Sequence, residues 1–350
     1  MRAIIVAVVG LLGLSAVAQN KINPDISLNA LFTLRGGTEG NKAQSEVQNG
    51  FALQEAELRL TSNIDVYFRG DIILAVENEK GQYSVAPEEA FVETLKLPSM
   101  TVRVGKFYPY WGRSNQWHTH AFPFIDALQT REAMFGEEGF NETGLAISYL
   151  FPTSWYFEGV LQFFSAENSA VFASPGKDDG ATVYFLKNLW DLTDSSTVEL
   201  DLGFGEGQDV QSMSNKIYNA ALTYKSKLAG QRQLLGTIEY SSSDRRYFED
   251  EDNPGTYLSQ DKLSVASAWL QYEFIKRWWS QIKYEVVSHP ESNTIEDVKI
   301  SSLLFGFVPS EFSAIRLQYD WIDDPSKSDP EQRVALQLNV TMGAHPAHDY

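Results

Sequence analysis

Residues 334–342 read Val-Ala-Leu-Gln-Leu-Asn-Val-Thr-Met, and this stretch decides the fold class. Large apolar side chains occupy every second position from Val334 to Met342, and small or polar side chains occupy the positions between them. Successive side chains of a β-strand point to opposite faces, so this spacing predicts a strand with one apolar face and one polar face.

The same alternation recurs through the chain. Residues 315–321 and 281–286 repeat it, with charged side chains such as Arg316 and Lys283 on the face opposite the apolar one. The pattern predicts an all-β protein of about 16 strands. We expect the strands near residues 25–36, 50–62, 65–76, 85–96, 100–107, 142–151, 154–165, 182–190, 196–205, 215–226, 231–242, 260–274, 277–287, 297–307, 311–321 and 332–343.

The connections between these strands alternate in length. Short turns are expected around residues 62–65, 97–99, 152–153, 191–195, 228–230, 276–277 and 309–310, and longer polar loops at about 37–49, 77–84, 108–141, 166–181, 207–214, 243–259, 288–296 and 322–331. This asymmetry is typical of outer-membrane barrels, whereas a secreted soluble β-sandwich or propeller has no reason to alternate in this way. We therefore predict that residues 19–350 form a closed antiparallel transmembrane β-barrel with short periplasmic turns and long external loops.

The N-terminal segment and the composition agree with export. Arg2 is followed by an apolar run and by Ala16-Val17-Ala18, which predicts a secretory signal peptide over residues 1–18. No later segment approaches the roughly 18 apolar residues that a membrane-spanning helix needs. The chain has no Cys, and its net charge of −18 argues against nucleic acid as a partner. Its eight Trp, sixteen Tyr and twenty-one Phe can form aromatic girdles at two membrane interfaces.

The chain ends in an aromatic residue, Tyr350, as chains assembled into the outer membrane commonly do. In this feature and in its loop asymmetry it resembles outer-membrane porins, and its size and layout are similar to the phosphate-selective porin O/P type. Phosphate-selective porins share a strongly basic channel, whereas 46 acidic residues outnumber 28 basic ones here. The resemblance implies a Gram-negative outer-membrane location, with lipid and lipopolysaccharide as partners and a homotrimer as a candidate assembly.

Charged side chains on the polar face of the strands are candidates for the lining of the lumen. A cation that faces lipid near the middle of the bilayer costs about 2–4 kcal/mol, so we expect these side chains to point inward. There they either set ion selectivity or form compensating ion pairs that stiffen the wall. The candidates are Glu55, Glu57, Arg59, Arg69, Asp71, Arg103, Glu199, Asp201, Glu239, Lys283, Glu285, Arg316 and Asp320.

The loop at 108–141 is much longer than the others. Loops of this length are usually functional or disordered, and aromatic side chains such as Trp111 and Phe135 argue against disorder. The porin resemblance implies that this loop folds into the lumen and narrows it, and a rigid external cap on the barrel rim is the other interpretation. The candidate constriction residues are Arg113, His118, His120, Asp126, Arg131, Glu132, Glu137 and Glu138.

His118 and His120 are candidate ligands for a divalent metal ion. They are two positions apart, so both imidazoles can lie on one side of an extended segment, and imidazole suits Zn²⁺, Cu²⁺ or Ni²⁺. A further ligand can come from Asp126, Glu132 or Glu137, but the spacing does not select one. A solvated or hydrogen-bonded histidine pair is the alternative.

His345 and His348 form a second pair beyond the last predicted strand, at the expected periplasmic mouth. The same two interpretations hold for this pair, a metal site or a solvated pair. Apart from such a divalent metal, we expect no cofactor.

Signatures of catalysis are absent from the sequence, which contains no G-x-S-x-G, no H-E-x-x-H and no Walker loop. We therefore predict a channel for the passive diffusion of small hydrophilic solutes or ions, and not an enzyme. The excess of acidic residues predicts a weak cation preference, because a pore in a low-dielectric wall focuses the field of its lining charges. The alternatives are an outer-membrane protein that binds a transition metal through its histidines and a secreted soluble β-protein with a binding role.

Overall fold

The computed structural model describes residues 24–38, 49–79, 82–173, 180–230, 232–244, 247–249, 257–259, 262–289 and 297–343. The predicted signal segment 1–18, the histidines His345 and His348 and the terminal Tyr350 lie outside these ranges. None of the helices in the described ranges has the length and apolar character needed to cross a membrane.

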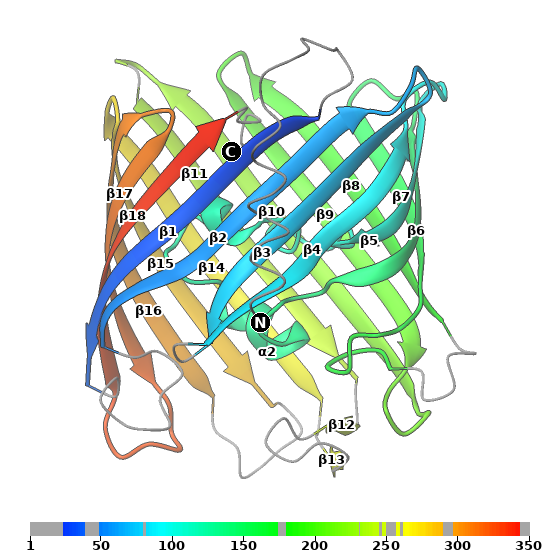
Figure 1. Cartoon of the computed structure of the whole chain (residues 1–350). Coiled ribbons are helices and arrows are strands. Elements are labelled where there is room, and N and C mark those ends of the chain that lie inside the picture. Colours follow the sequence, from blue (N-terminus) through cyan, green and yellow to red (C-terminus); the bar gives the residue numbers. More distant parts are fainter. Residues whose placement is uncertain are drawn as a thin grey trace, which may run out of the picture.

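Sixteen antiparallel strands in the described part of the chain form a closed barrel (Figure 1). Strand β1 (Asp25–Gly37) pairs with β18 (Glu331–Gly343) and so closes the sheet, with Ser27 opposite Gly343. Every barrel strand therefore has a partner on both sides, which satisfies the backbone hydrogen bonds without an exposed edge. The other barrel strands are β2 (Gly50–Asn63), β3 (Phe68–Glu79), β4 (Gln82–Thr94), β5 (Met100–Phe107), β6 (Glu142–Leu150), β7 (Tyr156–Phe164), β8 (Ala181–Thr193), β9 (Ser196–Gln208), β10 (Ser214–Leu228), β11 (Arg232–Ser243), β14 (Leu263–Ile275), β15 (Trp278–Ser288), β16 (Val298–Ser310) and β17 (Ser313–Asp323).

The predicted fold class and strand number are confirmed, and two predicted details are wrong. The expected long loop at 77–84 is a two-residue connection, because β3 runs to Glu79 and β4 begins at Gln82. The expected turn at 309–310 belongs to β16, and the chain turns at residues 311–312 instead. The expected loop at 243–259 contains a small hairpin of β12 (Tyr247–Glu249) and β13 (Tyr257–Ser259).

The connections distinguish the two ends of the barrel. We call the end with the connections 276–277 and 311–312 the short-turn end, and the opposite end, where β12 and β13 lie, the long-loop end (Figure 1). The described termini of the barrel, the start of β1 and the end of β18, lie at the short-turn end.

The outward-facing side chains form an apolar belt around the barrel. Aliphatic residues such as Leu222, Ile282 and Leu317 occupy its middle and are largely exposed. Large aromatic side chains lie toward the strand ends, for example Trp278 near the short-turn end and Trp321 near the long-loop end. An apolar band between two aromatic girdles is the outer surface expected of a barrel in lipid.

The inward-facing side chains of the same strands are polar. On β15 the buried residues Gln281, Lys283 and Glu285 alternate with the exposed Ile282 and Tyr284. The interior of the barrel therefore contains charged groups that must be paired or hydrogen-bonded.

Candidate functional site

Residues 108–141, which we call the inner loop, leave β5 and return to β6 through the interior of the barrel (Figure 1). The inner loop contains the 3-10 turn η1 (Thr119–Ala121) and the helix α2 (Gln129–Phe135). Side chains of β1, β2, β4, β7, β9, β15, β17 and β18 hydrogen-bond to it. It therefore lies within the ring of strands and does not form a cap on the rim.

Polar side chains of the wall satisfy the backbone of the inner loop around Ile125. The Gln318 side chain accepts a hydrogen bond from the Ile125 N–H at 2.8 Å, and Gln54 donates to the Ile125 carbonyl at 3.0 Å. Next to this point, Arg35 donates two hydrogen bonds to the Asp126 carboxylate, at 2.9 and 2.6 Å. Buried backbone groups without partners are costly, so these contacts fix the path of the loop.

The predicted lumen residue Arg316 also binds the backbone of the inner loop. Its Nη1 donates to the carbonyl of Phe122 at 2.5 Å and to that of Phe124 at 3.3 Å, and its Nε donates to Gln337 at 2.7 Å. Only 4% of Arg316 is exposed, so it braces the loop from β17 and has little contact with solvent.

Helix α2 is held by two further predicted lumen residues, Glu285 and Lys283. The Glu285 carboxylate accepts hydrogen bonds from the N–H and the hydroxyl of Thr130, both at 3.1 Å. Lys283 Nζ lies 2.5 Å from the other oxygen of the same carboxylate, and both side chains are almost fully buried. A carboxylate beside the first turn of a helix satisfies its free N–H groups.

Arg113 anchors the first part of the inner loop to β9. Its Nη1 donates to Glu199 at 2.8 Å, and Lys187 contacts the same carboxylate at 3.2 Å. The buried Asp201 follows Glu199 on the inner face of β9. This group of charges forms a paired network between loop and wall.

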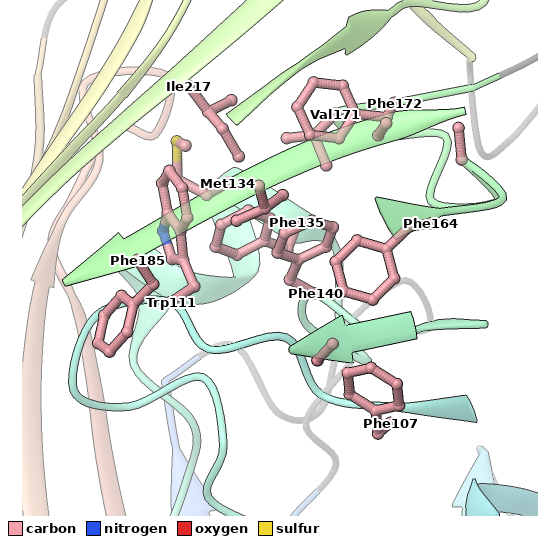
Figure 2. Close-up of a cluster of buried hydrophobic side chains, with 14 of the residues drawn as sticks. Phe107, Trp111, Met134, Phe135, Phe140, Phe164, Val171, Phe172, Phe185 and Ile217 are labelled. Atoms are coloured by element: carbon pink, nitrogen blue, oxygen red, sulfur yellow. The ribbon is translucent and has the colours of Figure 1, made fainter. Parts of the chain in front are cut away.

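A hydrophobic core joins the inner loop to the wall, with members on strands from β4 to β14 (Figure 2). Phe135 and Phe140 stack with ring centroids 5.0 Å apart, and Trp111 packs edge-on against both. Phe164 and Phe172 lie beside Phe140 at 6.0 and 6.1 Å. This side of the interior is therefore filled.

The alternation of single strands did not predict this core, although β8 carries a signal for it. Val183 and Phe185 of β8 are buried against the core, and Tyr184 and Leu186, which alternate with them, are exposed on the outer face. A strand that is apolar on both faces is buried on both sides, or faces lipid on one side and a core on the other.

The histidines of the inner loop meet carboxylates of the wall. His118 Nε2 lies 3.0 Å from Glu89 Oε2, and His118 Nδ1 lies 3.0 Å from Glu88 Oε2. Glu57 Oε2 lies 3.6 Å from His118 Nδ1 and 3.0 Å from His120 Nδ1. The carboxylates next to the histidines thus come from β2 and β4, and the expected partners Asp126, Glu132 and Glu137 are not among them.

Two local irregularities explain why sequence spacing missed these partners. In the β3–β4 pair, Ile73 lies opposite Glu89 but Leu74 lies opposite Pro87, so Glu88 is the extra residue of a β-bulge. A bulge interrupts the alternation of faces, and both Glu88 and Glu89 reach His118. In the same way, Gln54 is the extra residue of a bulge in β2, opposite β1. Gln54 contacts the inner loop, and its neighbour in the sequence, Glu55, is buried.

Burial and neighbouring charges shift the pKa of three residues of the inner loop. Burial opposes protonation of His118, but the carboxylates of Glu88 and Glu57 outweigh it and hold the His118 pKa well above its usual range. Burial also acts on Asp126, and the ion pair with Arg35 outweighs it and lowers the Asp126 pKa. Burial and the nearby Asp126 raise the pKa of Glu132 to about 8.

The remaining predicted constriction residues lie apart from the histidines. Arg131 is buried, donates to the Glu138 carbonyl at 3.0 Å and packs over the ring of Tyr108. The side chains of Glu137 and Glu138 are exposed.

The other predicted lumen residues form ion pairs along the wall. Arg59 donates to Asp71 through two hydrogen bonds, at 2.9 and 2.6 Å. Arg69 and Arg103 share Glu93, at 3.7 and 3.1 Å.

Two of the predicted lumen residues accept hydrogen bonds from neutral side chains. Asp320 accepts from Gln318 at 2.9 Å, and Glu239 accepts from Asn219 at 2.9 Å.

A cavity of about 880 Å³ lies between the inner loop and the wall at the short-turn end, and we call it the vestibule. Four Arg or Lys side chains and two Glu side chains line it, together with several aromatic rings. The charged lining residues are Arg113, Lys276, Arg277, Arg316, Glu273 and Glu311, and the ring-bearing ones are Trp117, His120, Phe122, Trp269, Trp279 and Phe312.

No family description matches the chain. An uncharacterized protein of Aquifex aeolicus (strain VF5) is 26% identical over 380 aligned positions, which cover 97% of this chain and 79% of that one.

Solved structures with a similar fold are outer-membrane porins. OmpF of Salmonella typhi, in complex with daunomycin, superposes with a TM-score of 0.64 at 12% identity and covers 93% of this chain and 99% of that one. OprB of Pseudomonas putida gives 0.61 at 10% identity, with coverage of 91% and 94%. The anion-selective porin of Comamonas acidovorans gives 0.56 at 11% identity, with coverage of 91% and 98%. The chain therefore has the fold of the 16-stranded outer-membrane porins.

Proposed function

We propose that the protein is an outer-membrane channel of porin type, through which small hydrophilic solutes or ions diffuse passively, and not an enzyme. The observation that carries this proposal is the inner loop, which is fixed inside a closed barrel beside a vestibule of about 880 Å³. A polar interior within an apolar outer belt is what a water-filled passage through lipid needs.

The outer surface supports a position in the outer membrane, with lipid and lipopolysaccharide as partners. The belt of exposed residues such as Leu222 and Leu317 would be in contact with water in a secreted soluble protein. The short-turn end is then periplasmic and the long-loop end external. The predicted homotrimer and the likeness to the phosphate-selective O/P type stay predictions.

In this proposal, solutes reach the inner loop through the vestibule and pass it beside Trp117, His120 and Phe122, which line both the loop and the cavity. The hydrophobic core around Trp111 and Phe140 fills another side of the interior. A second buried cluster around Phe124 and Trp269 packs the inner loop against the wall beside the vestibule, and we assign the route to the vestibule itself. Arg113, which also lines the vestibule, is the constriction residue on this path.

The charge of the vestibule bears on selectivity. The acid excess of the whole chain predicts a weak cation preference, but the vestibule lining has four cationic side chains against two carboxylates. Charges in the lining act on a permeating ion more strongly than charges on distant loops. The charges that line the vestibule therefore do not support the predicted cation preference.

Reconstitution of the full-length, detergent-folded protein into liposomes tests the proposal. Swelling in solutions of sugars of increasing size should show uptake of small sugars and a size cutoff, and a salt gradient across a planar bilayer gives the ion preference from the reversal potential. Absence of any solute flux through a correctly folded barrel would contradict the channel function. A clear anion preference would contradict only the predicted cation preference.

A further inference from the structure

We propose that Glu57, Glu88 and His118 bind one divalent transition-metal ion between the wall and the inner loop. One ligand atom from each residue lies within 4.8 Å of the other two. In a four-coordinate site with bonds of about 2.0–2.2 Å, neighbouring ligand atoms lie about 3.4 Å apart. The 3.0 Å and 3.6 Å distances from His118 Nδ1 to Glu88 and Glu57 are close to that spacing.

The second nitrogen of His118 supports the assignment. Nε2 lies 3.0 Å from Glu89 Oε2, in hydrogen-bond geometry. If Nε2 carries the hydrogen and donates it to Glu89, the lone pair of Nδ1 points toward Glu57 and Glu88. A metal-binding histidine usually donates its other N–H to a carboxylate, which fixes the ring and increases its basicity.

The three ligands also contain buried polar atoms without a hydrogen-bond partner. These atoms are Oε1 of Glu57, Oε2 of Glu88 and Nδ1 of His118. Glu88 Oε2 and His118 Nδ1 face each other at 3.0 Å, and the Glu57 side chain is only 1% exposed. Buried polar atoms normally have partners, so Glu57 Oε1, which has none among the described residues, supports a further partner in this cluster.

The carboxylates that meet at this cluster favour a cation there. Glu55 interacts electrostatically with Glu57 and Glu88, and Glu89 completes a group of four carboxylates around His118. Arg59, on the same strand as Glu57, is held by two hydrogen bonds to Asp71. A dication compensates this excess of negative charge without requiring a further basic side chain.

The donor set defines the class of ion. One imidazole and two carboxylates suit Zn²⁺, Co²⁺ or another first-row ion better than Ca²⁺, which takes six to eight oxygen ligands. His120, which contacts Glu57, also lines the vestibule, so the cluster adjoins a solvent-filled space through which an ion can enter.

Calorimetry with Zn²⁺ and visible absorption with Co²⁺, on the full-length detergent-folded protein, test this site. We expect one ion per chain and the intense Co²⁺ bands of a four-coordinate site. Glu57→Gln and Glu88→Gln keep the side-chain shape and each remove a ligand charge. Each should weaken binding at least as much as loss of a hydrogen-bond partner of a ligand does, which is roughly 10- to 100-fold. His118→Ala should abolish the Co²⁺ bands, and His289→Ala, outside the cluster, should leave both readouts unchanged.

The retained fold of each variant is checked by the change in gel mobility that folded barrels show on heating. No binding of Zn²⁺ by the folded wild type, or equal binding by His118→Ala, would overturn the proposal, and the cluster would then be an ion pair of protonated His118. Binding is measured in detergent without any flux, so its outcome is independent of whether the barrel conducts.

Discussion

Arg35 of β1 and Asp126 of the inner loop form an ion pair of two hydrogen bonds between residues 91 positions apart in the sequence. The Arg35 side chain is 12% exposed and that of Asp126 is 27% exposed, so water screens this pair only in part. The pair joins the first strand of the barrel to the middle of the loop that crosses its interior.

Arg35→Ala should loosen this junction. Hydrogen bonds to charged groups contribute about 1.5–3 kcal/mol each, and the variant leaves Asp126 without its main partner, so we expect a loss of about 2 kcal/mol. Unfolding by guanidinium measures the loss. Arg35→Ala/Asp126→Ala should lose less than the sum of the single variants, and strict additivity would show that the pair does not stabilise the loop.

Glu285→Gln should destabilise the barrel more strongly than Arg35→Ala. The change leaves the Lys283 cation, whose side chain is 3% exposed, without its carboxylate at 2.5 Å. Removal of one partner of a buried ion pair costs about 3–5 kcal/mol. Lys283→Met/Glu285→Gln, which removes both charges, should recover part of the loss in the same unfolding experiment, and no recovery would contradict the pairing.

Gly112→Ala should displace the inner loop from the wall. Gly112 has a φ of +56°, and an added Cβ would lie 1.8 Å from Glu239 Oε1, which Asn219 holds by a hydrogen bond of 2.9 Å. We expect a lower unfolding midpoint together with a larger or noisier conductance.

Gly230→Ala is the matched control for this change. Gly230 also has a positive φ, of +77°, but an added Cβ would meet only Arg232, at 3.9 Å. The control should show only the cost of the left-handed backbone, about 1–2 kcal/mol, with unchanged conductance. Equal conductance of the two variants would argue against the close fit of the loop at Gly112.

The pKa of Glu132 predicts a pH dependence of stability. It rises from an ordinary value near 4.5 to about 8 because of burial and of the carboxylates of Asp126, Glu285 and Glu137, which outweigh Arg131. Folding disfavours the charged form of Glu132. The stability that depends on protonated Glu132 is therefore fully present below pH 4.5 and is lost as the pH rises through about 8.

Glu132→Gln removes this titration. It should therefore be more stable than the wild type above pH 8. The rise of the Glu132 pKa from 4.5 to about 8, at about 1.4 kcal/mol per unit, sets an upper bound of about 5 kcal/mol, which screening by solvent lowers. Below pH 4.5 the two proteins should unfold at the same denaturant concentration. A difference that stays constant over this pH range would show that Glu132 does not titrate as inferred.

The barrel was predictable from the sequence because apolar and polar residues alternate within each strand and so distinguish its two faces. Residues 334–342 alternate without interruption and lie in β18, with Val334, Leu336 and Leu338 exposed on the outer face. The short connection between β3 and β4 was not predictable, because β3 runs on through the polar residues 77–79 and β4 begins at Gln82, in a stretch that resembles a loop in sequence. Strands that extend beyond the lipid no longer need an apolar face.

The partners of the inner loop were less predictable than the barrel itself. They depend on contacts between distant positions, such as Ile125 with Gln318, 193 residues away. They also depend on the bulge at Glu88, because one extra residue in a strand changes which side chains face inward. The local sequence contains no pattern that predicts this bulge. The sequence identified His118 and His120 as candidate ligands, and only the folded chain shows the carboxylates beside them.

Single-channel conductance of the wild-type protein and of a variant without residues 113–137 tests the central claim most directly. The deletion removes most of the inner loop, and a short deletion of the exposed residues 325–328, in the connection between β17 and β18, is the control outside the inner loop. We expect stable steps for the wild type, clearly larger steps for the inner-loop deletion and wild-type steps for the control. No conductance from folded wild type, or equal steps from the inner-loop deletion, would contradict a channel that is narrowed by residues 108–141.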